Sequence, residues 1–495
     1  MEVSRNIQEN ETYVRNRCEN CDDIIIRPMM LGRDGGVRAL VFYIEVAVSN
    51  MMLEDSVVGK LVNHLWMVPD EEVVEFVSRN GFGISDTAEF TDMEQAFQSM
   101  LAGNAVFLID GYEKAIKVGS KGYPNMGVTK AESEKVLRGS KEGFSDSVKT
   151  NTALIRKRIR STNLKVEEIR VGMRSDTVVA LVYMDGLLYP EMLEKIKNRL
   201  EQYEIDGVWD SGMLEQLAEE NWISPFPQFE STERPDLAAM EIMNGRLAVI
   251  SDNSPVSLLL PTTFASFFKV SEDRYNRFLL VSFTRAVRYA AMFLALLMSS
   301  LYLAVICFHT QILPTNLLLS FAEARKGVPF PSIIEVLLME LAFELIREAG
   351  IRMPGPLSGT IGIVGGLIIG DAAVSANLVS PMAVVVVALS ALASFAIPGE
   401  EFQAAFRLLK FCFIILGGIG GIFGIVLGLF LLAGHLAALT SFQIPYLMPF
   451  VGQQLKGYED ERDDIFRAPF RKMNLRPVFT KRDERVRLKK NVKCK

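Results

Sequence analysis

The stretch YAAMFLALLMSSLYLAVICF, residues Tyr289–Phe308, contains no charged side chain. Leu357–Leu378 carries a single charge, Asp371, and Phe411–Leu439 carries none and has one histidine, His435. A bilayer core of about 30 Å requires about 20 apolar residues in a helix, so each stretch is long enough to span a membrane. The sequence therefore predicts a polar N-terminal half followed by a helical membrane half.

Charge and cysteine content indicate how the chain is oriented. The net charge is −6, yet the tail from Lys456 onward is net basic. Residues Met1–Asn20 lack an apolar core, so we expect no cleavable signal peptide, and five scattered cysteines fit a reducing compartment. Basic residues before the first span and in the tail place both termini in the cytoplasm. The crossings should then be even in number, and we place them at 289–308, 357–379, 381–397 and 411–439.

The N-terminal half contains a faint internal repeat. LVFYIEVAVSN (Leu40–Asn50) aligns without a gap with ALVYMDGLLYP (Ala180–Pro190), so that Tyr43 matches Tyr183. Each copy follows another strand-like stretch and precedes a helix-like one. The prediction is a soluble α/β N-terminal region of two small α/β subdomains, followed by an α-helical polytopic membrane domain. Two unrelated strands of similar composition are the alternative. The helix-like stretches are Leu53–Leu65 and Glu191–Leu200.

This pattern divides the chain into four parts. Residues 1–130 form the first α/β subdomain, and residues 131–275 a linker helix with the second. Residues 276–450 form the transmembrane domain, and residues 451–495 a basic cytoplasmic tail. Within the second part, Asn151–Arg160 reads as a basic amphipathic helix, either a solvated face or a contact with lipid headgroups or a neighbouring subunit. We also expect Pro261–Val270 to lie on the bilayer surface with its aromatic side chains in the interface.

Motifs for catalysis are missing from the sequence. Cys18 and Cys21 form a lone CxxC without a second Cys/His pair nearby, so neither a zinc site nor a redox role is favoured. There is no phosphate loop, dinucleotide fingerprint, nucleophile elbow or HExxH. We therefore expect no enzyme activity, no cofactor and no bound metal.

Acidic residues in the membrane half are the main candidates for function. In IIEVLLMELAFELIREAG (Ile333–Gly350), Glu340 and Glu344 share one helical face with Arg347 and Glu348, while Glu335 lies among apolar neighbours. So many charges argue against a lipid-facing span. The helix could lie in the interface, held by Glu–Arg pairs, line a water-filled path, or form a subunit contact.

Asp371 and a glycine stripe add two further features. A carboxylate inside a span indicates function because burial in lipid is costly, although Asp371 could instead cap a half-helix. Gly420, Gly424 and Gly428 repeat at four-residue spacing, the small-xxx-small pattern of close helix packing. Whether they pack within the chain or between subunits stays open. Between the last two crossings, Glu400 to Lys410 reads as a short surface helix.

Several blocks of sequence are similar to one known family. These blocks include NTALIRKRIRSTNLKVEEIRVGMRSDTVVALVYMDGLLYPEMLEKIKNRL (Asn151–Leu200), FPQFESTERPD (Phe226–Asp236), EVLLMELAFELIREAGIRMPGP (Glu335–Pro356), IGDAAVSANLVSP (Ile369–Pro381) and SFQIPYLMPF (Ser441–Phe450). On these blocks, the chain from about residue 20 to 480 resembles the A subunit of spore germinant receptors, the GerA family. Asn377, where glycine is expected, and Glu45-Val46 in the first copy depart from its pattern.

This resemblance implies a multi-pass subunit of a nutrient germinant receptor complex in the inner membrane of a dormant endospore, which triggers germination. Its implied partners are a transporter-like B subunit, a lipoprotein C subunit, membrane lipid and further copies of itself, with a pentameric ring proposed; nucleic acid is not among them. The implied activity is a ligand-gated cation channel. On that basis Glu335, Glu340, Glu344 and Asp371 are candidates for the ion path or its gate, and Gly420, Gly424 and Gly428 for helix packing.

Three other functions stay open on the sequence. One is a secondary carrier, although the spans are few and show no inverted repeat. Another is an accessory ion-channel paralogue of the SpoVA-locus type. The third is a soluble scaffold with a membrane anchor, for which a single span would suffice.

Overall fold

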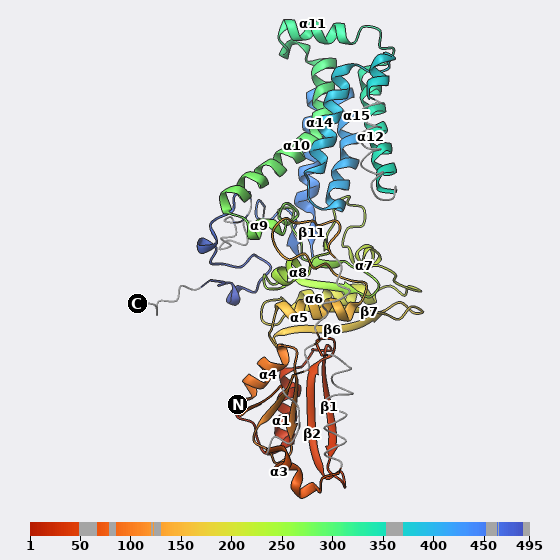
Figure 1. The fold of residues 1–495 in the computed structure, drawn as a ribbon. Helices are drawn as coiled ribbons and strands as arrows, with labels where there is room; N and C mark the ends of the chain where they lie inside the picture. Colours follow the sequence, from red (N-terminus) through yellow and green to blue (C-terminus); the bar gives the residue numbers. More distant parts are fainter. Residues whose placement is uncertain are drawn as a thin grey trace. The chain divides into compact units, whose positions relative to one another are not determined.

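The computed structural model describes residues 1–48, 67–78, 86–119, 122, 130–352, 370–451, 463 and 465–488. Within these residues the chain forms two compact units (Figure 1). The α/β unit comprises residues 1–219, 229–261 and the end of the chain from Asn474. The helical unit comprises residues 220–228 and 262–473.

The first half of the α/β unit is a five-stranded antiparallel sheet. Its strand order is β1-β2-β4-β5-β3. Side chains alternate across it: Leu40 and Phe42 pack on the side of α1 and α4, whereas Val41 packs on the side of α3. The elements are α1 (Ile7–Arg17), β1 (Ile24–Leu31), β2 (Val37–Ile44), η2 (Asp70–Glu72), α3 (Val73–Ser78), β3 (Thr87–Phe90), α4 (Met93–Leu101), β4 (Ala105–Ile109) and β5 (Ala115–Val118).

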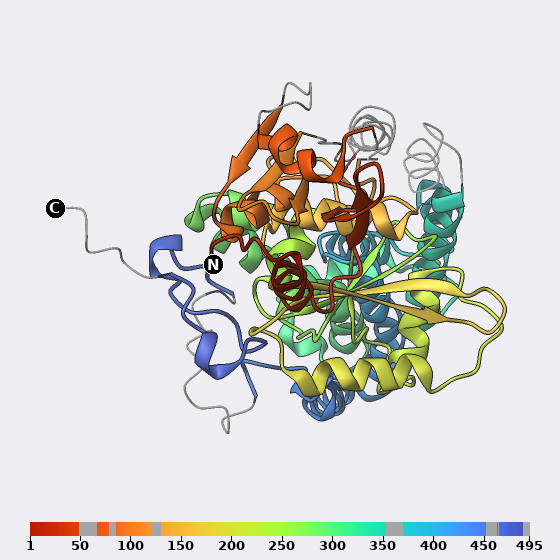
Figure 2. The same cartoon turned by 90° about the horizontal axis from the view of Figure 1, so that it is seen from below.

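The second half repeats this topology. Its order, β6-β7-β9-β10-β8, is the same path through an antiparallel sheet, and the β6–β7 hairpin is longer than the strands beside it (yellow in Figure 2). The elements are α5 (Val148–Arg158), β6 (Leu164–Val171), β7 (Thr177–Met184), α6 (Pro190–Glu201), α7 (Ser211–Ala218), β8 (Glu230–Thr232), α8 (Pro235–Ile242), β9 (Leu247–Ser251) and β10 (Ser257–Leu260).

The strand positions bear out the internal repeat. β6 and β7 begin and end 140 residues after β1 and β2 (164 − 24 and 177 − 37), which is the spacing at which Tyr43 matches Tyr183. The helix predicted at Glu191–Leu200 is α6. The helix predicted at Leu53–Leu65 lies outside the described residues.

The predicted linker helix is wrong. Residues 130–147 contain no helix, and α5 begins only at Val148. The segment is instead tied down by side chains of the second half. The Glu233 carboxylate accepts hydrogen bonds from the backbone N–H groups of Glu132 and Ser133, and the Arg234 guanidinium donates to the carbonyl oxygen of Ser140. These contacts take backbone groups that a helix would use internally.

One buried ion pair joins the two halves of the α/β unit. Arg156 on α5 is fully buried and donates to both carboxylate oxygens of Asp23, at 2.8 and 2.7 Å. It also donates to the carbonyl oxygens of Ser161 and Leu164, each at 2.9 Å. The basic residues of this predicted amphipathic helix therefore include one that is neither a solvated face nor a lipid contact.

A pH-dependent contact holds the linker segment in place. The half-buried Glu134 carboxylate accepts a hydrogen bond from Thr232 Oγ1 at 2.7 Å. Burial, to which the nearby Glu230 carboxylate adds, raises the pKa of Glu134 from 4.5 to about 7. The contribution of the neutral Glu134 carboxyl to the free energy of unfolding is fully present below pH 4.5. It is lost as the pH rises through 7, at no more than about 1.4 kcal/mol per pH unit.

We therefore expect the melting temperature of the full-length protein to fall more steeply between pH 5 and pH 8 than that of the Glu134→Gln variant. Gln keeps an acceptor for Thr232 but cannot ionise. Thermal unfolding in detergent at several pH values measures the difference. Parallel pH profiles for the two proteins would contradict the prediction.

The helical unit is a bundle with a short helix across one end (Figure 1). α10 packs most extensively on α14 and α15, and α12 packs on α14 and α15. Arg285 and Arg288, near the start of α10, form ion pairs with Asp273. The helices are α9 (Glu272–Tyr275), α10 (Phe278–Phe308), α11 (Thr315–Ala324), α12 (Ser332–Arg352), α14 (Pro381–Phe395) and α15 (Glu400–Ala438); a two-stranded hairpin, β11 (Thr440–Ser441) with β12 (Ile444–Pro445), follows.

α15 folds back on itself at Gly421. This residue has φ 56° and ψ −142°, a conformation open to glycine because it lacks a Cβ. The ring of Phe226 lies 5.5 Å from that of Phe406 and 6.3 Å from that of His435, between centroids. A continuous helix would separate these two positions by about 44 Å. The expectation of one crossing at 411–439 is therefore wrong, because Gly421 divides this region between two antiparallel arms.

Aromatic side chains fill the end of the bundle where the two arms of α15 meet the loop 220–228. Phe264, Phe267 and Phe268 are buried there against Phe402 and Tyr446. The Phe267 and Phe402 rings stack at 4.5 Å between centroids. The prediction that Pro261–Val270 places its aromatic side chains in the membrane interface is therefore wrong, since they pack inside the protein.

Candidate functional site

Helix α12 buries carboxylates inside the bundle and exposes leucines on the outside. Glu335 and Glu340 are fully buried, as is Val336 between them. Leu341 and Leu345, on the opposite face, are exposed. A helix in a water-soluble protein has the reverse arrangement, with its apolar stripe toward the core.

Glu340 is neutralised by a lysine from α15. Lys410 Nζ lies 2.5 Å from Glu340 Oε2 and 3.8 Å from Glu344 Oε1. Ser299 on α10 donates to the other oxygen of Glu340 at 2.6 Å. Both charged groups of the pair are buried, so each depends on the other for compensation.

Glu344 lies one turn further along α12 and pairs with an arginine of the same α15 arm. Arg407 Nη2 is 2.6 Å from Glu344 Oε2, and Arg407 Nε is 3.1 Å from the same oxygen. Both side chains are largely buried. The basic residues at positions 407 and 410 were predicted to lie on a surface helix, and this is wrong because both point into the bundle.

Glu335, Glu340 and Glu344 form a row of carboxylates along α12. At the Glu335 end of this row lies a third basic side chain. Glu335 Oε1 accepts a hydrogen bond from the backbone N–H of Ser380, the N-cap of α14, and Glu335 Oε2 lies 3.8 Å from Arg325 Nε. Within the part of the chain that the structure describes, neither Glu335 Oε2 nor Arg325 Nε has a hydrogen-bond partner. Three carboxylates of α12 thus face three basic side chains from other elements.

The structure separates Asp371 from this row. Asp371 lies in a short helical stretch, 370–375, and its side chain is exposed. Most of the predicted span that contains it, residues 357–369, lies outside the described residues. Arg347 also leaves the row: its guanidinium donates to Ser394 Oγ at 2.8 Å and lies over the ring of Phe395, 4.4 Å from its centroid.

The glycine stripe divides between two environments. A Cβ added at Gly424 would lie 2.2 Å from the carbonyl oxygen of Leu416, and one at Gly428 would lie 2.8 Å from Leu416 Cδ1. These two glycines face the first arm of α15. At Gly420 a Cβ would meet no described atom within 4 Å. Packing at Gly420 therefore stays a prediction, within the chain or between subunits.

The CxxC pair is buried in the core of the first sheet. Cys18 and Cys21 are not in a disulfide, and no group of metal-binding side chains occurs among the residues described. Burial raises the pKa of the Cys18 thiol to about 12, with Cys21 adding to the rise, and burial also raises the pKa of Cys21. The thiolate is the reactive form, so both residues are held in the unreactive state.

We expect Cys18 and Cys21 to resist alkylation while the protein is folded. Iodoacetamide at pH 8 should leave both unmodified, and the same treatment in denaturant should modify both. Peptide mass spectrometry distinguishes the two results. Rapid modification of either thiol in the folded protein would contradict the burial.

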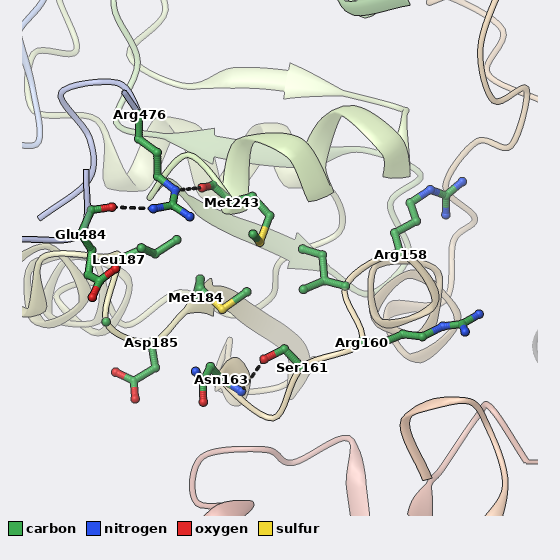
Figure 3. A pocket seen from close by; sticks show the side chains of 12 residues that line it. Arg158, Arg160, Ser161, Asn163, Met184, Asp185, Leu187, Met243, Arg476 and Glu484 are labelled. Atoms are coloured by element: carbon green, nitrogen blue, oxygen red, sulfur yellow. Dashed lines mark hydrogen bonds between the residues drawn. The ribbon is translucent and has the colours of Figure 1, made fainter. Parts of the chain in front are cut away.

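A cavity of about 580 Å³ in the α/β unit is a weaker candidate (Figure 3). Met184 and Met243 line it, and its arginines are turned away or already bonded. Arg158 and Arg160 point away from it in Figure 3. Arg476 donates to the carbonyl oxygens of Met243 and Glu484, at 3.1 and 2.5 Å. We assign no ligand to this cavity.

Sequence reasoning found the acids of the row and missed their basic partners and Ser299. The partners are far away in the chain: Lys410 is 70 residues from Glu340, and Arg407 is 63 residues from Glu344. The spacing of the charges was a usable signal. Glu340 and Glu344 lie four residues apart on one apolar helix, and Arg407 and Lys410 lie three residues apart near the start of another.

Fold and site together define a chain with an α/β unit of two similar halves and a helical bundle that contains internal charge pairs. The sequence model of the Bacillus/Clostridium GerA spore germination protein family matches residues 12–479. The chain belongs to this GerA family.

Three relatives align with this chain over nearly their whole length. "Uncharacterized membrane protein YfkQ" of Bacillus subtilis (strain 168) is 40% identical, over 96% of this chain and 91% of the relative. "Spore germination protein A1" of the same organism is 35% identical, over 95% of each chain, and "Spore germination protein GerLA" of Bacillus cereus is 34% identical, over 99% of each. Among solved structures, the N-terminal domain of the A subunit of the Bacillus megaterium spore germinant receptor GerK3 is 26% identical, with a TM-score of 0.43, covering 53% of this chain and 98% of that one.

Proposed function

We propose that this chain is the membrane subunit of a nutrient germinant receptor complex that triggers endospore germination, and that it conducts cations as an oligomer. The observation that carries the proposal is that α12 buries the carboxylates Glu335 and Glu340 inside the bundle and exposes leucines on its outer face. Exposed leucines suit a lipid or subunit environment, while buried carboxylates suit a polar path through it. Curated relatives named as spore germination proteins support the biological role.

Membrane location is supported by length and composition. α10 and α15 are the two described helices that are long and apolar enough to cross a bilayer. Each arm of α15, 400–420 and 422–438, would extend about 25–31 Å at 1.5 Å per residue, close to a bilayer core of about 30 Å. The sequence predicts four crossings, of which 411–439 is now replaced by the two arms of α15. The number of crossings then becomes five, which is odd. Two cytoplasmic termini then require one further crossing, and α12 is the natural candidate.

The charge pairs suit a closed state of the path. Carboxylates along a path attract cations, but here Lys410 and Arg407 occupy the places that passing cations would take. Opening would require α15 to withdraw these groups from Glu340 and Glu344. A germinant on a partner subunit can drive this change only by binding the open state more tightly than the closed one.

The proposal also names the partner subunits and the membrane in which the complex lies. We expect a transporter-like B subunit and a lipoprotein C subunit in the spore inner membrane, together with further copies of this chain in the pentameric ring that the family resemblance implies. The three domain boundaries predicted from the sequence, after residues 130, 275 and 450, and Asp371 as a residue of the path belong to the same proposal.

Potassium release by spores tests the function and the residues together. Spores that carry Glu340→Gln or Asp371→Asn should release potassium more slowly on germinant addition than wild type, at equal receptor abundance. Glu348→Gln is the matched control, because Glu348 is exposed and pairs with Arg352 on the same helix. Wild-type release by both variants would refute the residue assignment, and normal germination without this chain would refute the function.

A further inference from the structure

A loop at one end of the helical bundle presents two large apolar side chains to the outside. Trp222 is 81% exposed and Ile223 is 73% exposed. They lie in the segment 220–228, which belongs to the helical unit. Side chains of this size are seldom left so open side by side on a soluble surface without a binding role.

The loop is held firmly below these two residues. Gln228 Oε1 accepts hydrogen bonds from the backbone N–H groups of Glu220 and Asn221, at 2.9 and 3.1 Å, and Gln228 Nε2 donates to the carbonyl oxygen of Asn221 at 2.9 Å. Ser224 Oγ lies 3.0 Å from His435 Nε2. Such internal bonding lets the tip leave water without exposing many unsatisfied backbone groups.

The loop adjoins an apolar surface that continues along the second arm of α15. Phe226 packs on His435 and Phe406, so the base of the loop lies at the end of both arms. One helical turn before His435, the exposed side chains are apolar: Leu431, and beside it Phe430, which is 75% exposed. The tip therefore extends the surface that the proposed function assigns to lipid.

We propose that Trp222 and Ile223 anchor the bundle in the headgroup region of the bilayer, at the end where the two arms of α15 meet the loop. The inference rests on the proposed membrane location. Tryptophan favours this region because its ring is apolar and its indole N–H can still find a polar partner. The buried Phe264, Phe267 and Phe268 leave this role to the loop.

Fluorescence quenching by brominated lipids tests the anchor in the full-length protein. Three single-tryptophan chains are compared in nanodiscs of phosphatidylcholine and phosphatidylglycerol: one keeps Trp222, one keeps Trp209 of the α/β unit, and one carries Phe430→Trp. Trp209 is 67% exposed and serves as the matched control. Bromine is placed either near the headgroup end or near the methyl end of the acyl chain.

Trp222 should lose most of its intensity with bromine near the headgroup and less with deep bromine, and Trp209 should keep its intensity with both. Phe430→Trp should respond more to the deep position. In the chain with all native tryptophans, Trp222→Phe should remove most of the shallow quenching, which guards against a folding defect from the other substitutions.

Two results would overturn the anchor alone. In the first, Trp222 fluorescence is quenched by aqueous acrylamide and by neither bromine position, while Phe430→Trp is quenched by bromine. This result would place the loop in water. In the second, Trp222 is shielded from bromine and acrylamide alike, which would assign it to a protein partner. If Phe430→Trp is also unaffected by bromine, the membrane location itself fails.

Discussion

Replacing Lys410 by methionine should lower the stability of the helical unit by about 3–5 kcal/mol, the typical cost of removing one partner from a buried ion pair. Methionine leaves Glu340 fully buried, with Ser299 as its remaining close partner. Arg407 stays with Glu344 and cannot replace the lost charge. Thermal and denaturant unfolding of the full-length protein in detergent measures the loss.

A double variant shows whether charge or packing is responsible. Glu340→Gln together with Lys410→Met removes both charges and keeps an acceptor for Ser299, so it should recover most of the stability. Arg352→Met is the control, since it breaks an exposed pair with Glu348 on the same helix and should cost less than about 1 kcal/mol. Equal losses for Lys410→Met and Arg352→Met would contradict a buried pair.

Replacing Arg156 by methionine should destabilise the α/β unit by a similar amount, about 3–5 kcal/mol or more. The change leaves the Asp23 carboxylate buried without its bidentate partner, and it also removes the donors to two backbone carbonyls, at Ser161 and Leu164. Because Asp23 and Arg156 belong to different halves of the unit, the contact between the halves should loosen first.

Hydrogen exchange of the full-length protein locates this effect. Amides of β6 and of the segment before β1 should exchange much faster in Arg156→Met than in wild type. Arg170→Met breaks the exposed pair of Arg170 with Asp176 and should leave exchange nearly unchanged. Unchanged exchange around residues 20–24 and 160–166 in Arg156→Met would show that the pair does not join the halves.

The α/β fold could be predicted from sequence because its signal is local. Short apolar runs rich in β-forming residues mark β2 and β7, and the gapless match of Tyr43 with Tyr183 reflects the 140-residue spacing of the strands. The linker helix was predicted wrongly because charge content suggested a helix. The contacts of Glu233 and Arg234 that fix that segment lie about 100 residues away in the chain.

In the helical half, the kinds of residue could be predicted but not their partners. Glu335, Glu340 and Glu344 were recognised because acids are rare in apolar helices. Pairing with Lys410 and Arg407 depends on how α12 and α15 pack, which periodicity does not encode. The reversal at Gly421 was hidden in a glycine-rich run, where the same residues indicate close packing and a turn equally well.

Ion conductance of the complete receptor complex in planar bilayers, with its germinant present, tests the central claim most directly. The account predicts discrete conductance steps that favour potassium over chloride, with weaker preference in the Glu344→Gln variant and no change in Glu348→Gln. Transport without steps, or equal permeability to both ions that Glu344→Gln leaves unaltered, would contradict a cation path controlled by the charge pairs of α12 and α15.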